Sequence, residues 1–321
     1  MREDFKSTCE TMMNTTRRLL VIVLCSIHTH TAIGQVPEKP VYYFNPQWSP
    51  DGASIVFEST REGKSSIYVI APDGTGLKRI TDTTFDYGQP AWSPDGRHLV
   101  YYGGNKPMQL FRNSRQGGQQ KQLPTKGYDA YQPVWSLQNK IAFDLRALTQ
   151  TPSDIAKINA DGTGFIKLTT DEKYDCAAPQ WSPDGKTILF QRSIALRKPW
   201  KEITKEEMMQ KRKSAEIMLM KSDGSDARVL LSHLEGEVAP FWSDDGKAIY
   251  FVSKQDTLPA LFTIQIGKPQ PTLVLTLSGR VYSASISPDG KYVTYAAERK
   301  KKHAVYVQDI QSKTERKLIG D

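Results

Sequence analysis

A short segment running from Pro179 to Gly185, with the sequence PQWSPDG, recurs along almost the whole chain. With its tryptophan as marker, the copies fall at positions 48, 92, 135, 181, 242 and 286, where the last carries isoleucine, so the steps are 44, 43, 46, 61 and 44. A period near 44, with one insertion of about 17 residues, is typical of a propeller in which each repeat is one supersecondary unit. The complete and partial copies begin at Pro46, Pro90, Pro133, Pro179, Pro240 and Ile286.

The second repeat shows which secondary structure each unit is expected to form. Alternation around Trp92, the Ser-Pro-Asp-Gly break and the run from His98 to Tyr102 predict two strands joined by a tight turn, in which Gly96 supplies the positive φ. In the first repeat a second hairpin follows, with strands at 66–70 and 77–81 around another Asp-Gly turn. Six such repeats predict an all-β, six-bladed β-propeller of four-stranded antiparallel blades over residues 44–321.

The pattern PxWSPDGxxIxFxS, followed by IYxxxxDG and then LT, resembles the WD-like repeat of TolB-type propellers over residues 44 to 320. The resemblance implies a periplasmic propeller of the kind found in the C-terminal part of TolB. TolB also has an N-terminal α/β domain, and we expect none here because the first repeat follows the predicted mature start by about ten residues. The resemblance therefore covers the propeller part only, without the contacts that TolB makes through its N-terminal part.

The N-terminal region is typical of a secretory signal. Arg17 and Arg18 precede nine apolar residues, Leu19 to Ile27, and the small residues Ala32 and Gly34 follow. Nine apolar residues are too few for a transmembrane span, which needs about 20. We therefore expect a signal peptide and leader at 1–34, an N-terminal segment at 35–43, the propeller at 44–321, and a periplasmic or secreted protein.

The net charge and the cysteine content exclude few classes of function. The formal net charge is +8, and about +7 after the leader is removed. This mildly basic balance suits anionic glycans, membranes or nucleic acids, but no recognition motif accompanies it, so we expect no nucleic-acid binding. Outside the leader only Cys176 remains, and no histidine lies in register with it, which favours a packed residue over a nucleophile. We expect a monomer.

The residues before each innermost strand are the candidate ligand-binding site. Asp86, Asp129 and Asp175 occupy the same position in three consecutive repeats, and Arg280 occupies it in the sixth. In a four-stranded antiparallel blade the crossovers to the next blade lie on the face opposite the Asp-Gly turns, so these residues are expected to surround one mouth of the channel. The full candidate set is Asp86, Asp129, Asp175, Arg280, Tyr128, Tyr131, Tyr174, Tyr282, Gln89, Gln132, Glu235 and Glu237.

Three carboxylates near one axis would repel each other. Arg280, a bound cation such as calcium, or a cationic or polyhydroxylated ligand held between the tyrosines would offset that repulsion. Alternatively, each aspartate accepts hydrogen bonds from backbone amides of a neighbouring blade and only ties the blades together. No contiguous metal-binding loop is present, so no cofactor is expected and calcium stays an open possibility.

The insertion lies in the fourth repeat, at about 194–215. Within it Thr204 and Glu207 form the pattern of a capping box, and Lys211 to Lys213 would favour the end of a helix of about nine residues. As a loop between the second and third strands it should share the face of the aspartates, either as a lid or docking element or as a helix lying on the blade edge. The basic run from Arg299 to His303 is expected to form a solvated loop on the same face.

Two classes of function remain. The first is an exported, non-catalytic, TolB-like propeller that binds an envelope protein, peptide or glycan at the channel mouth. The alternative is a propeller-fold polysaccharide lyase or glycosidase that acts through carboxylates at the same mouth. A prolyl-oligopeptidase-type peptidase is excluded because the chain contains no GxSxG motif and no room for a hydrolase domain. Without a recognisable catalytic constellation, the sequence favours the binding protein.

Overall fold

The computed structural model describes residues 40–147, 152–232, 240–255 and 257–320. The predicted leader at 1–34 and most of the predicted segment at 35–43 lie outside these ranges. Within them, no helix has both the length and the apolar character needed to cross a membrane.

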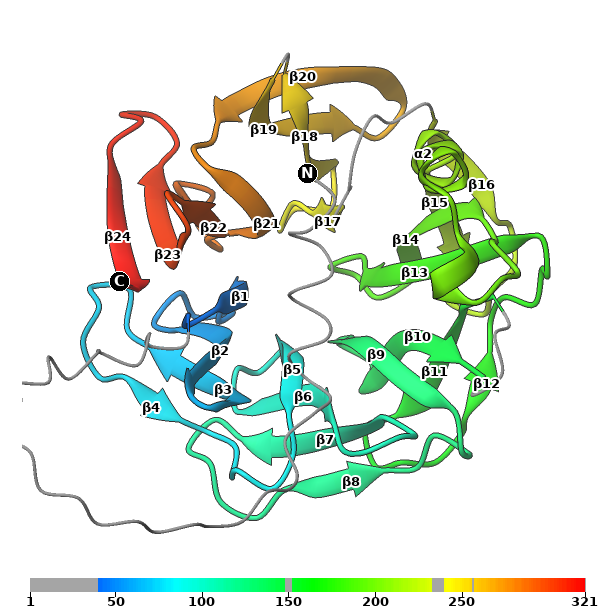
Figure 1. The fold of residues 1–321 in the computed structure, drawn as a ribbon, viewed down its shortest axis with the longest axis horizontal. Coiled ribbons are helices and arrows are strands. Elements are labelled where there is room, and N and C mark those ends of the chain that lie inside the picture. Colours follow the sequence, from blue (N-terminus) through cyan, green and yellow to red (C-terminus); the bar gives the residue numbers. More distant parts are fainter. Residues whose placement is uncertain (1–39, 148–151, 233–239, 256, 321) are drawn as a thin grey trace, which may run out of the picture. The chain divides into compact units, whose positions relative to one another are not determined.

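The described chain forms six four-stranded antiparallel sheets arranged around a common axis (Figure 1), which confirms the predicted six-bladed propeller. In each sheet the strands follow one another in sequence order, from the innermost strand outwards. Blade 1 consists of β1 (Tyr43–Trp48), β2 (Ile55–Glu62), β3 (Lys64–Ile70) and β4 (Lys78–Arg79). Blade 2 consists of β5 (Tyr87–Trp92), β6 (His98–Gly103), β7 (Gln109–Ser114) and β8 (Lys121–Leu123). Blade 3 consists of β9 (Asp129–Trp135), β10 (Lys140–Arg146), β11 (Asp154–Asn159) and β12 (Ile166–Lys167). Blade 4 consists of β13 (Tyr174–Trp181), β14 (Thr187–Ile194), β15 (Glu216–Lys221) and β16 (Arg228–Leu231). Blade 5 consists of β17 (Phe241–Trp242), β18 (Ala248–Gln255), β19 (Leu258–Gln265) and β20 (Lys268–Thr276). Blade 6 consists of β21 (Arg280–Ile286), β22 (Tyr292–Arg299), β23 (Lys302–Asp309) and β24 (Glu315–Gly320).

The repeated Ser-Pro-Asp-Gly segment closes the turn between the first two strands of a blade. In blade 2 the Ser93 hydroxyl donates to Asp95 Oδ1 at 2.6 Å and accepts from the His98 backbone N–H at 2.9 Å. Gly96 follows with φ of 66°, a conformation that glycine adopts without a steric penalty. The same serine–aspartate bond recurs in blades 1, 4, 5 and 6, so the motif that reveals the repeat serves a structural purpose.

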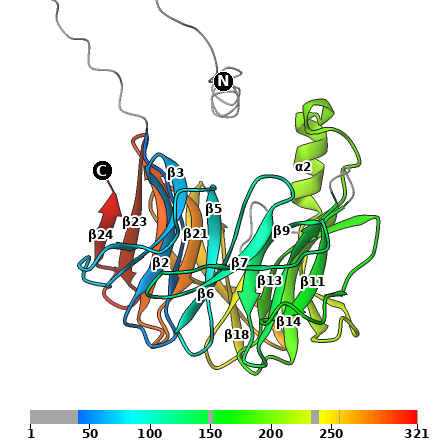
Figure 2. The same cartoon turned by 90° about the horizontal axis from the view of Figure 1, so that it is seen from below.

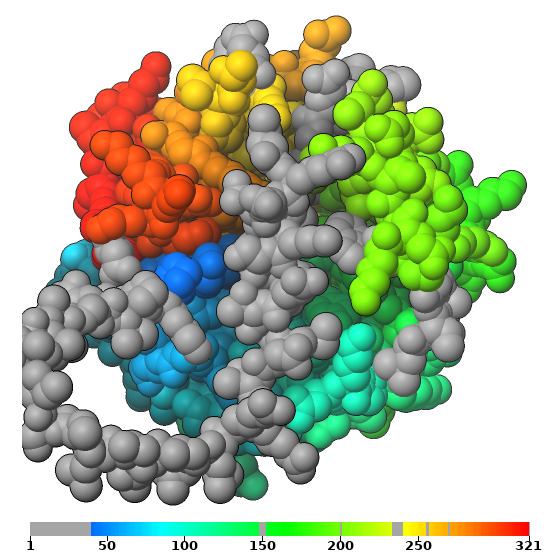
Figure 3. Space-filling model, viewed as in Figure 1, coloured from blue at the N-terminus to red at the C-terminus, as the bar shows by residue number. Residues whose placement is uncertain are grey.

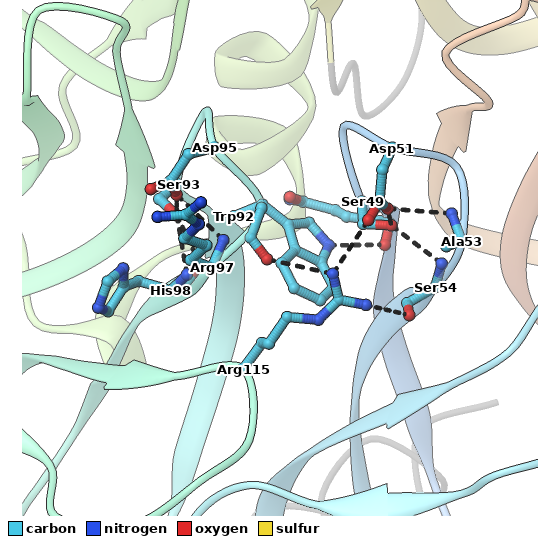
Figure 4. A network of polar contacts seen from close by, with 12 residues as sticks. Ser49, Asp51, Ala53, Ser54, Trp92, Ser93, Asp95, Arg97, His98 and Arg115 are labelled. Carbon is cyan, nitrogen blue, oxygen red and sulfur yellow. Dashed lines mark hydrogen bonds and ion pairs between the residues drawn. The ribbon is translucent and has the colours of Figure 1, made fainter.

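Adjacent turns are also joined to each other. Figure 4 shows Arg115, which directly follows β7, reaching across to the turn of blade 1. Its guanidinium donates to Asp51 Oδ2 at 3.1 Å and to the Ser54 hydroxyl at 2.7 Å. The same group lies 5.3 Å from the Trp92 ring centre, and the Trp92 indole N–H donates to the Gln47 carbonyl at 3.2 Å. One arginine and one tryptophan therefore fix the register between blades 1 and 2.

The core is divided into separate apolar layers, one at each boundary between blades. Between blades 1 and 2, for example, Val56 and Ile67 pack against Tyr87, Leu99 and Tyr101, all of them buried. Comparable clusters fill the other five boundaries of the described structure. Each blade therefore buries both of its faces, and no blade can bury them without a neighbour on each side.

The ring closes between blade 6 and blade 1 without exchange of a strand. The Asn45 N–H donates to the Ser283 hydroxyl at 2.9 Å, and the Trp48 N–H donates to the Ser285 hydroxyl at 3.3 Å. Beside these bonds Tyr43 packs in the apolar cluster that it shares with blade 6. Each blade is thus built from one continuous stretch of chain, and apolar and polar contacts together seal the first blade to the last.

The predicted insertion forms a 3-10 turn, η1 (Trp200–Glu202), and a helix, α2 (Lys205–Lys213). Thr204 is the N-cap of α2, and both bonds of its capping box with Glu207 are present, as predicted. In Figure 2, α2 stands beyond the ends of the blade 4 strands, and in Figure 3 the insertion covers the surface over that blade. None of its helical residues is buried, so it is held by a few polar contacts and not by an apolar face.

The prediction of a solvated loop from Arg299 to His303 is partly wrong. Strands β22 and β23 extend until only Lys300 and Lys301 remain between them. Arg299 forms a bidentate contact with Glu315, and His303 is buried within β23. The charges suggested a loop, but the alternation of apolar residues on both sides continues the hairpin almost to its tip.

This hairpin tip generates a stability prediction. Lys300 and Lys301 have φ of 51° and 64°, and a two-residue hairpin turn with two positive φ values favours Asn-Gly. We expect Lys300→Asn with Lys301→Gly to raise the free energy of unfolding by about 1 kcal/mol, measured by urea denaturation. Lys301→Ala removes the same side chain but leaves a residue with a Cβ at a positive φ. An equal increase in the free energy of unfolding of that variant would show that backbone strain is not the cause.

Candidate functional site

In Figure 1 the six innermost strands surround the propeller axis, and residues of these strands line a central channel. Its cavity has a volume of about 460 Å³ and receives residues from β1, β5, β9, β13, β17 and β21. The lining is rich in indole rings and side-chain amides, including Trp48, Trp92, Trp135, Trp181, Trp242, Asn45, Gln89 and Gln132.

A ring of hydrogen bonds, which we call the polar belt, surrounds this channel. In blades 1 to 4 the residue three before the marker tryptophan lies at a β-bulge and has a positive φ of 49° to 54°. Each bulge turns a backbone N–H out of its own sheet and toward the preceding blade. The donors are Asn45, Gln89, Gln132 and Ala178, and the acceptors are Ser283 Oγ, Glu58 Oε2, Gln89 Oε1 and Gln132 Oε1, at 2.9 to 3.0 Å.

Two buried acids complete the polar belt. Glu58 in β2 accepts from Gln89 N–H and from the Asn45 amide, each at 3.0 Å. Asp144 in β10 is 1% exposed, and its Oδ1 accepts from Ala178 N–H at 2.8 Å. Burial raises the pKa of Glu58, and it raises the pKa of Asp144 to about 8, which leaves Asp144 protonated at neutral pH.

Sequence reasoning found the two glutamines of the polar belt but missed both acids. A signal was available, because each acid interrupts an apolar run: Glu58 follows Ile55 to Phe57, and Asp144 follows Ile141 to Phe143. A charged residue inside a buried strand has to find a partner, and here the partners are the bulge amides of the next blade.

The three predicted aspartates each contact the preceding blade. Asp86 Oδ1 accepts from Ser65 N–H at 2.8 Å, Asp129 Oδ1 from Met108 N–H at 2.5 Å, and Asp175 Oδ1 from Ser153 N–H at 2.8 Å. All three donors lie at or just before the third strand of a blade. Each carboxylate is therefore held at a different blade boundary and ties two blades together, and none of the three lines the channel.

The predicted tyrosines are covered by cations of their own blades. Arg146 lies 5.3 Å from the ring centre of Tyr131, and Arg192 lies 4.3 Å from that of Tyr174. Arg280, predicted as part of the same site, lies 5.3 Å from the ring centre of Tyr282. Tyr128 stacks on Phe165 with Lys167 5.0 Å away from its ring centre. Each of these rings therefore has a cation of its own blade close to one face.

The remaining predictions concern two glutamates, a calcium site and Cys176. Glu235 and Glu237 lie outside the described residues. In the part of the chain that the structure describes, no group of three or more His, Cys, Asp or Glu side chains is arranged to hold a metal ion, so a calcium site stays a prediction. Cys176 is buried, and burial raises the pKa of its thiol to about 12, as expected of a packed residue.

The helix α2 is connected to the predicted site through Asp175. The Lys211 ammonium forms a salt bridge with Asp175 and donates to the Ile194 carbonyl at 3.1 Å. The Ser214 hydroxyl accepts from Ile194 N–H at 2.9 Å, just beyond the helix. The aspartate that ties blades 3 and 4 together therefore also fixes the base of the insertion.

An aromatic cluster surrounds His303 at the seam between blades 6 and 1. The rings of Tyr42, Phe44 and Tyr282 lie 4.6 to 6.1 Å from the His303 ring. His303 is 7% exposed, and its Nδ1 has no hydrogen-bond partner among the described residues. Burial lowers the pKa of His303, and this effect outweighs the opposing influence of Glu298.

Asp144 generates a prediction on pH dependence. An acid whose folded pKa is raised from 3.8 to about 8 stabilises the fold at low pH and loses that contribution as pH rises toward 8. Asp144→Asn keeps the acceptor for Ala178 N–H without the charge. We expect the free energy of unfolding of this variant, relative to wild type, to rise by about 4 kcal/mol between pH 5 and pH 9. A constant difference across that range in urea denaturation would contradict the assignment.

His303 generates a prediction of opposite sign. A histidine whose folded pKa is lowered resists protonation in the fold, so stability is lost as pH falls below the ordinary value of 6.5. We expect wild type to lose about 1 kcal/mol between pH 7 and pH 5 through this group. His303→Phe preserves a ring against Tyr42 and Tyr282, and its unfolding free energy should lack that loss. Parallel pH profiles for the two proteins would refute the prediction.

Comparison with known proteins agrees with this architecture. The family model described as the TolB beta propeller domain matches residues 11–212. A stretch of 48 residues is 44% identical to the Tol-Pal system protein TolB of Syntrophus aciditrophicus, covering 15% of this chain and 11% of that protein. This chain therefore spans only a small part of that relative's length.

Two solved structures illustrate the shared fold. TolB from Acinetobacter baumannii superposes with a TM-score of 0.64 at 16% identity, over 86% of this chain and 62% of that one. An oligogalacturonate lyase in complex with manganese superposes with a TM-score of 0.58 at 15% identity, over 86% and 77%. At these identities the superpositions show the fold alone. The family match over residues 11–212, together with the six blades described above, shows that the chain belongs to the TolB β-propeller domain family.

Proposed function

We propose that this chain is an exported, non-catalytic TolB-like propeller that binds a protein or peptide of the cell envelope at its central channel. It would act in the periplasm or outside the cell, as a monomer, and without nucleic acid. The predicted leader at 1–34 and the relatives named as Tol-Pal system proteins support this location.

The observation that carries the proposal is a pair of unpartnered donors in the channel wall. Trp48 and Trp181 line the channel, and their indole nitrogens are buried and have no hydrogen-bond partner within the described residues. By contrast, Trp92 and Trp242 donate to carbonyl groups of the preceding blades at 3.2 and 3.3 Å. A buried donor without a partner costs free energy, and a ligand whose carbonyl groups reach these nitrogens when the two indole rings shift in the channel wall would satisfy it.

The state of the carboxylates favours binding over catalysis. Asp86, Asp129 and Asp175 accept hydrogen bonds from backbone amides, and Asp175 also pairs with Lys211. A hydrolase or lyase of the alternative class needs carboxylates that are free to exchange protons with a substrate. A peptide backbone, with its regular carbonyl groups, suits the indole donors better than a substrate that requires paired acids.

Trp48→Phe and Trp181→Phe test the proposal, because each keeps the ring and removes only the N–H. Proteins from the envelope fraction would first be cross-linked to the tagged full chain, and the captured partner then purified and titrated. We expect each variant to weaken partner binding about tenfold, as for one lost hydrogen bond to a buried group, without a lower melting temperature.

Trp92→Phe is the matched control, since its N–H already has an intramolecular partner. That variant should lose about 1 kcal/mol of stability and keep its affinity for the partner. Wild-type affinity in both test variants would refute a channel site. Turnover of an acidic polysaccharide that Asp129→Asn abolishes would instead support the lyase or glycosidase.

A further inference from the structure

A second cavity lies among the turns between blades 2 and 3, next to the channel cavity. Its volume is about 710 Å³. We call it the turn-face pocket. It is lined by the turn of blade 2, by Arg112 of β7, by the turn of blade 3 and by the segment after β11: Ser93, Pro94, Asp95, His98, Arg112, Trp135, Leu137, Gln138, Asn139, Lys140, Asn159, Ala160 and Asp161.

The turn-face pocket exists because blade 3 departs from the repeat. In blades 1, 2 and 5 the glycine of the turn approaches the proline of the preceding turn: a Cβ would lie 3.9 Å from Pro288 at Gly52, 3.7 Å from Pro50 at Gly96, and 3.5 Å from Pro183 at Gly246. Blade 3 has Ser136-Leu137-Gln138-Asn139 in this place, with neither proline nor glycine.

The blade 3 turn is also one residue shorter. Ser136 N–H donates to the carbonyl four residues later, Lys140, whereas Ser93 N–H donates to the carbonyl five residues later, His98. The shorter turn leaves Pro94 without the glycine that would cover it, and Pro94 and Trp135 become walls of the pocket. This opening is therefore a feature of this chain's own sequence and not of the general repeat.

Two cations in the pocket have no carboxylate partner among the described residues. The Arg112 guanidinium donates to the Ala160 carbonyl at 3.3 Å, and the Lys140 ammonium donates to the Asn159 side-chain oxygen. Neither bond neutralises charge, and both side chains are only half-buried. The pair therefore attracts an anionic group, which the guanidinium can bind in a bidentate manner.

The other walls suit a sugar ring. Trp135 is half-buried, and its ring centre lies 6.2 Å from that of His98, so that two aromatic groups border one wall. The amides of Gln138, Asn139 and Asn159 supply donors and acceptors, and Asp95 and Asp161 supply carboxylate oxygens at the rim. Aromatic faces pack against the C–H face of a pyranose, while amides and carboxylates bind its hydroxyl groups.

We propose that the turn-face pocket binds a saccharide that carries a carboxylate. The cations would hold the carboxylate, Trp135 the ring, and the rim oxygens the hydroxyl groups. A polyphosphate fits less well, because Asp95 and Asp161 would repel several adjacent negative charges. The pocket adjoins the channel cavity and shares Pro94, Trp135 and Leu137 with it, but the proposal does not rest on the proposed function because it involves neither Trp48 nor Trp181.

The test titrates the full chain calorimetrically with trisaccharides of mannuronic acid and of galacturonic acid, with their methyl esters, and with inorganic phosphate. Binding of at least one acid trisaccharide is expected, weakened at least tenfold by methyl esterification. Lys140→Met and Arg112→Met should each weaken it about tenfold. Lys186→Met, which removes an exposed cation from the regular turn of blade 4, should leave affinity unchanged.

Three outcomes would overturn the proposal: no binding of either acid trisaccharide, equal binding of acid and ester, or binding that Lys140→Met leaves unchanged. Inorganic phosphate bound as tightly as the trisaccharides would also overturn it, by reducing the pocket to a simple anion site. Melting temperatures of Lys140→Met and Lys186→Met that agree would show that a loss of affinity does not reflect a loss of fold. Trp48→Phe should bind the saccharide normally, so failure here and failure of the channel proposal are distinguishable.

Discussion

The structure depends on apolar packing between the faces of adjacent blades. A four-stranded sheet of this size has two faces, and each can be buried only by another sheet. The six separate clusters show that every boundary between adjacent blades contains buried apolar side chains. The seam between blades 6 and 1 has no chain connection to hold it, so its apolar cluster and the bonds from Asn45 and Trp48 replace the covalent link that the other boundaries have.

Polar contacts fix the register between adjacent blades, which apolar packing alone does not determine. Flat apolar faces slide over one another at little cost, whereas a buried hydrogen bond is lost if the partners shift by a residue. Such bonds occur at three levels of the propeller: at the turns with Arg115, in the polar belt with Glu58 and Asp144, and at the crossovers with the three aspartates. The polar belt also supports the channel, because Asn45, Gln89, Gln132 and Ala178 belong to the channel wall.

Much of the fold could be predicted from the sequence, because a repeated tight turn records both the strand order and the number of blades. The helix α2 could also be predicted, because its capping box involves residues close in sequence. The candidate site was harder to predict than the fold. The position of Asp86 in its repeat was evident, but whether its carboxylate faces the channel or the third strand of blade 1 depends on the bulge and twist of the neighbouring strands. Glu58 was missed because its partner, Gln89, lies 31 residues away on another blade.

The departures from the repeat are more informative about function than the repeat itself. Regular turns and crossovers are explained by the contacts they make between blades, which leaves little for a ligand. Two irregularities, the shortened turn of blade 3 and the insertion in blade 4, leave groups that no neighbouring blade satisfies: the charges of Arg112 and Lys140 in one case, and the unburied helix α2 in the other. The shortened turn opens the turn-face pocket beside the channel, whereas α2 extends from the opposite ends of the strands (Figure 2), so the two irregularities alter different surfaces of one propeller.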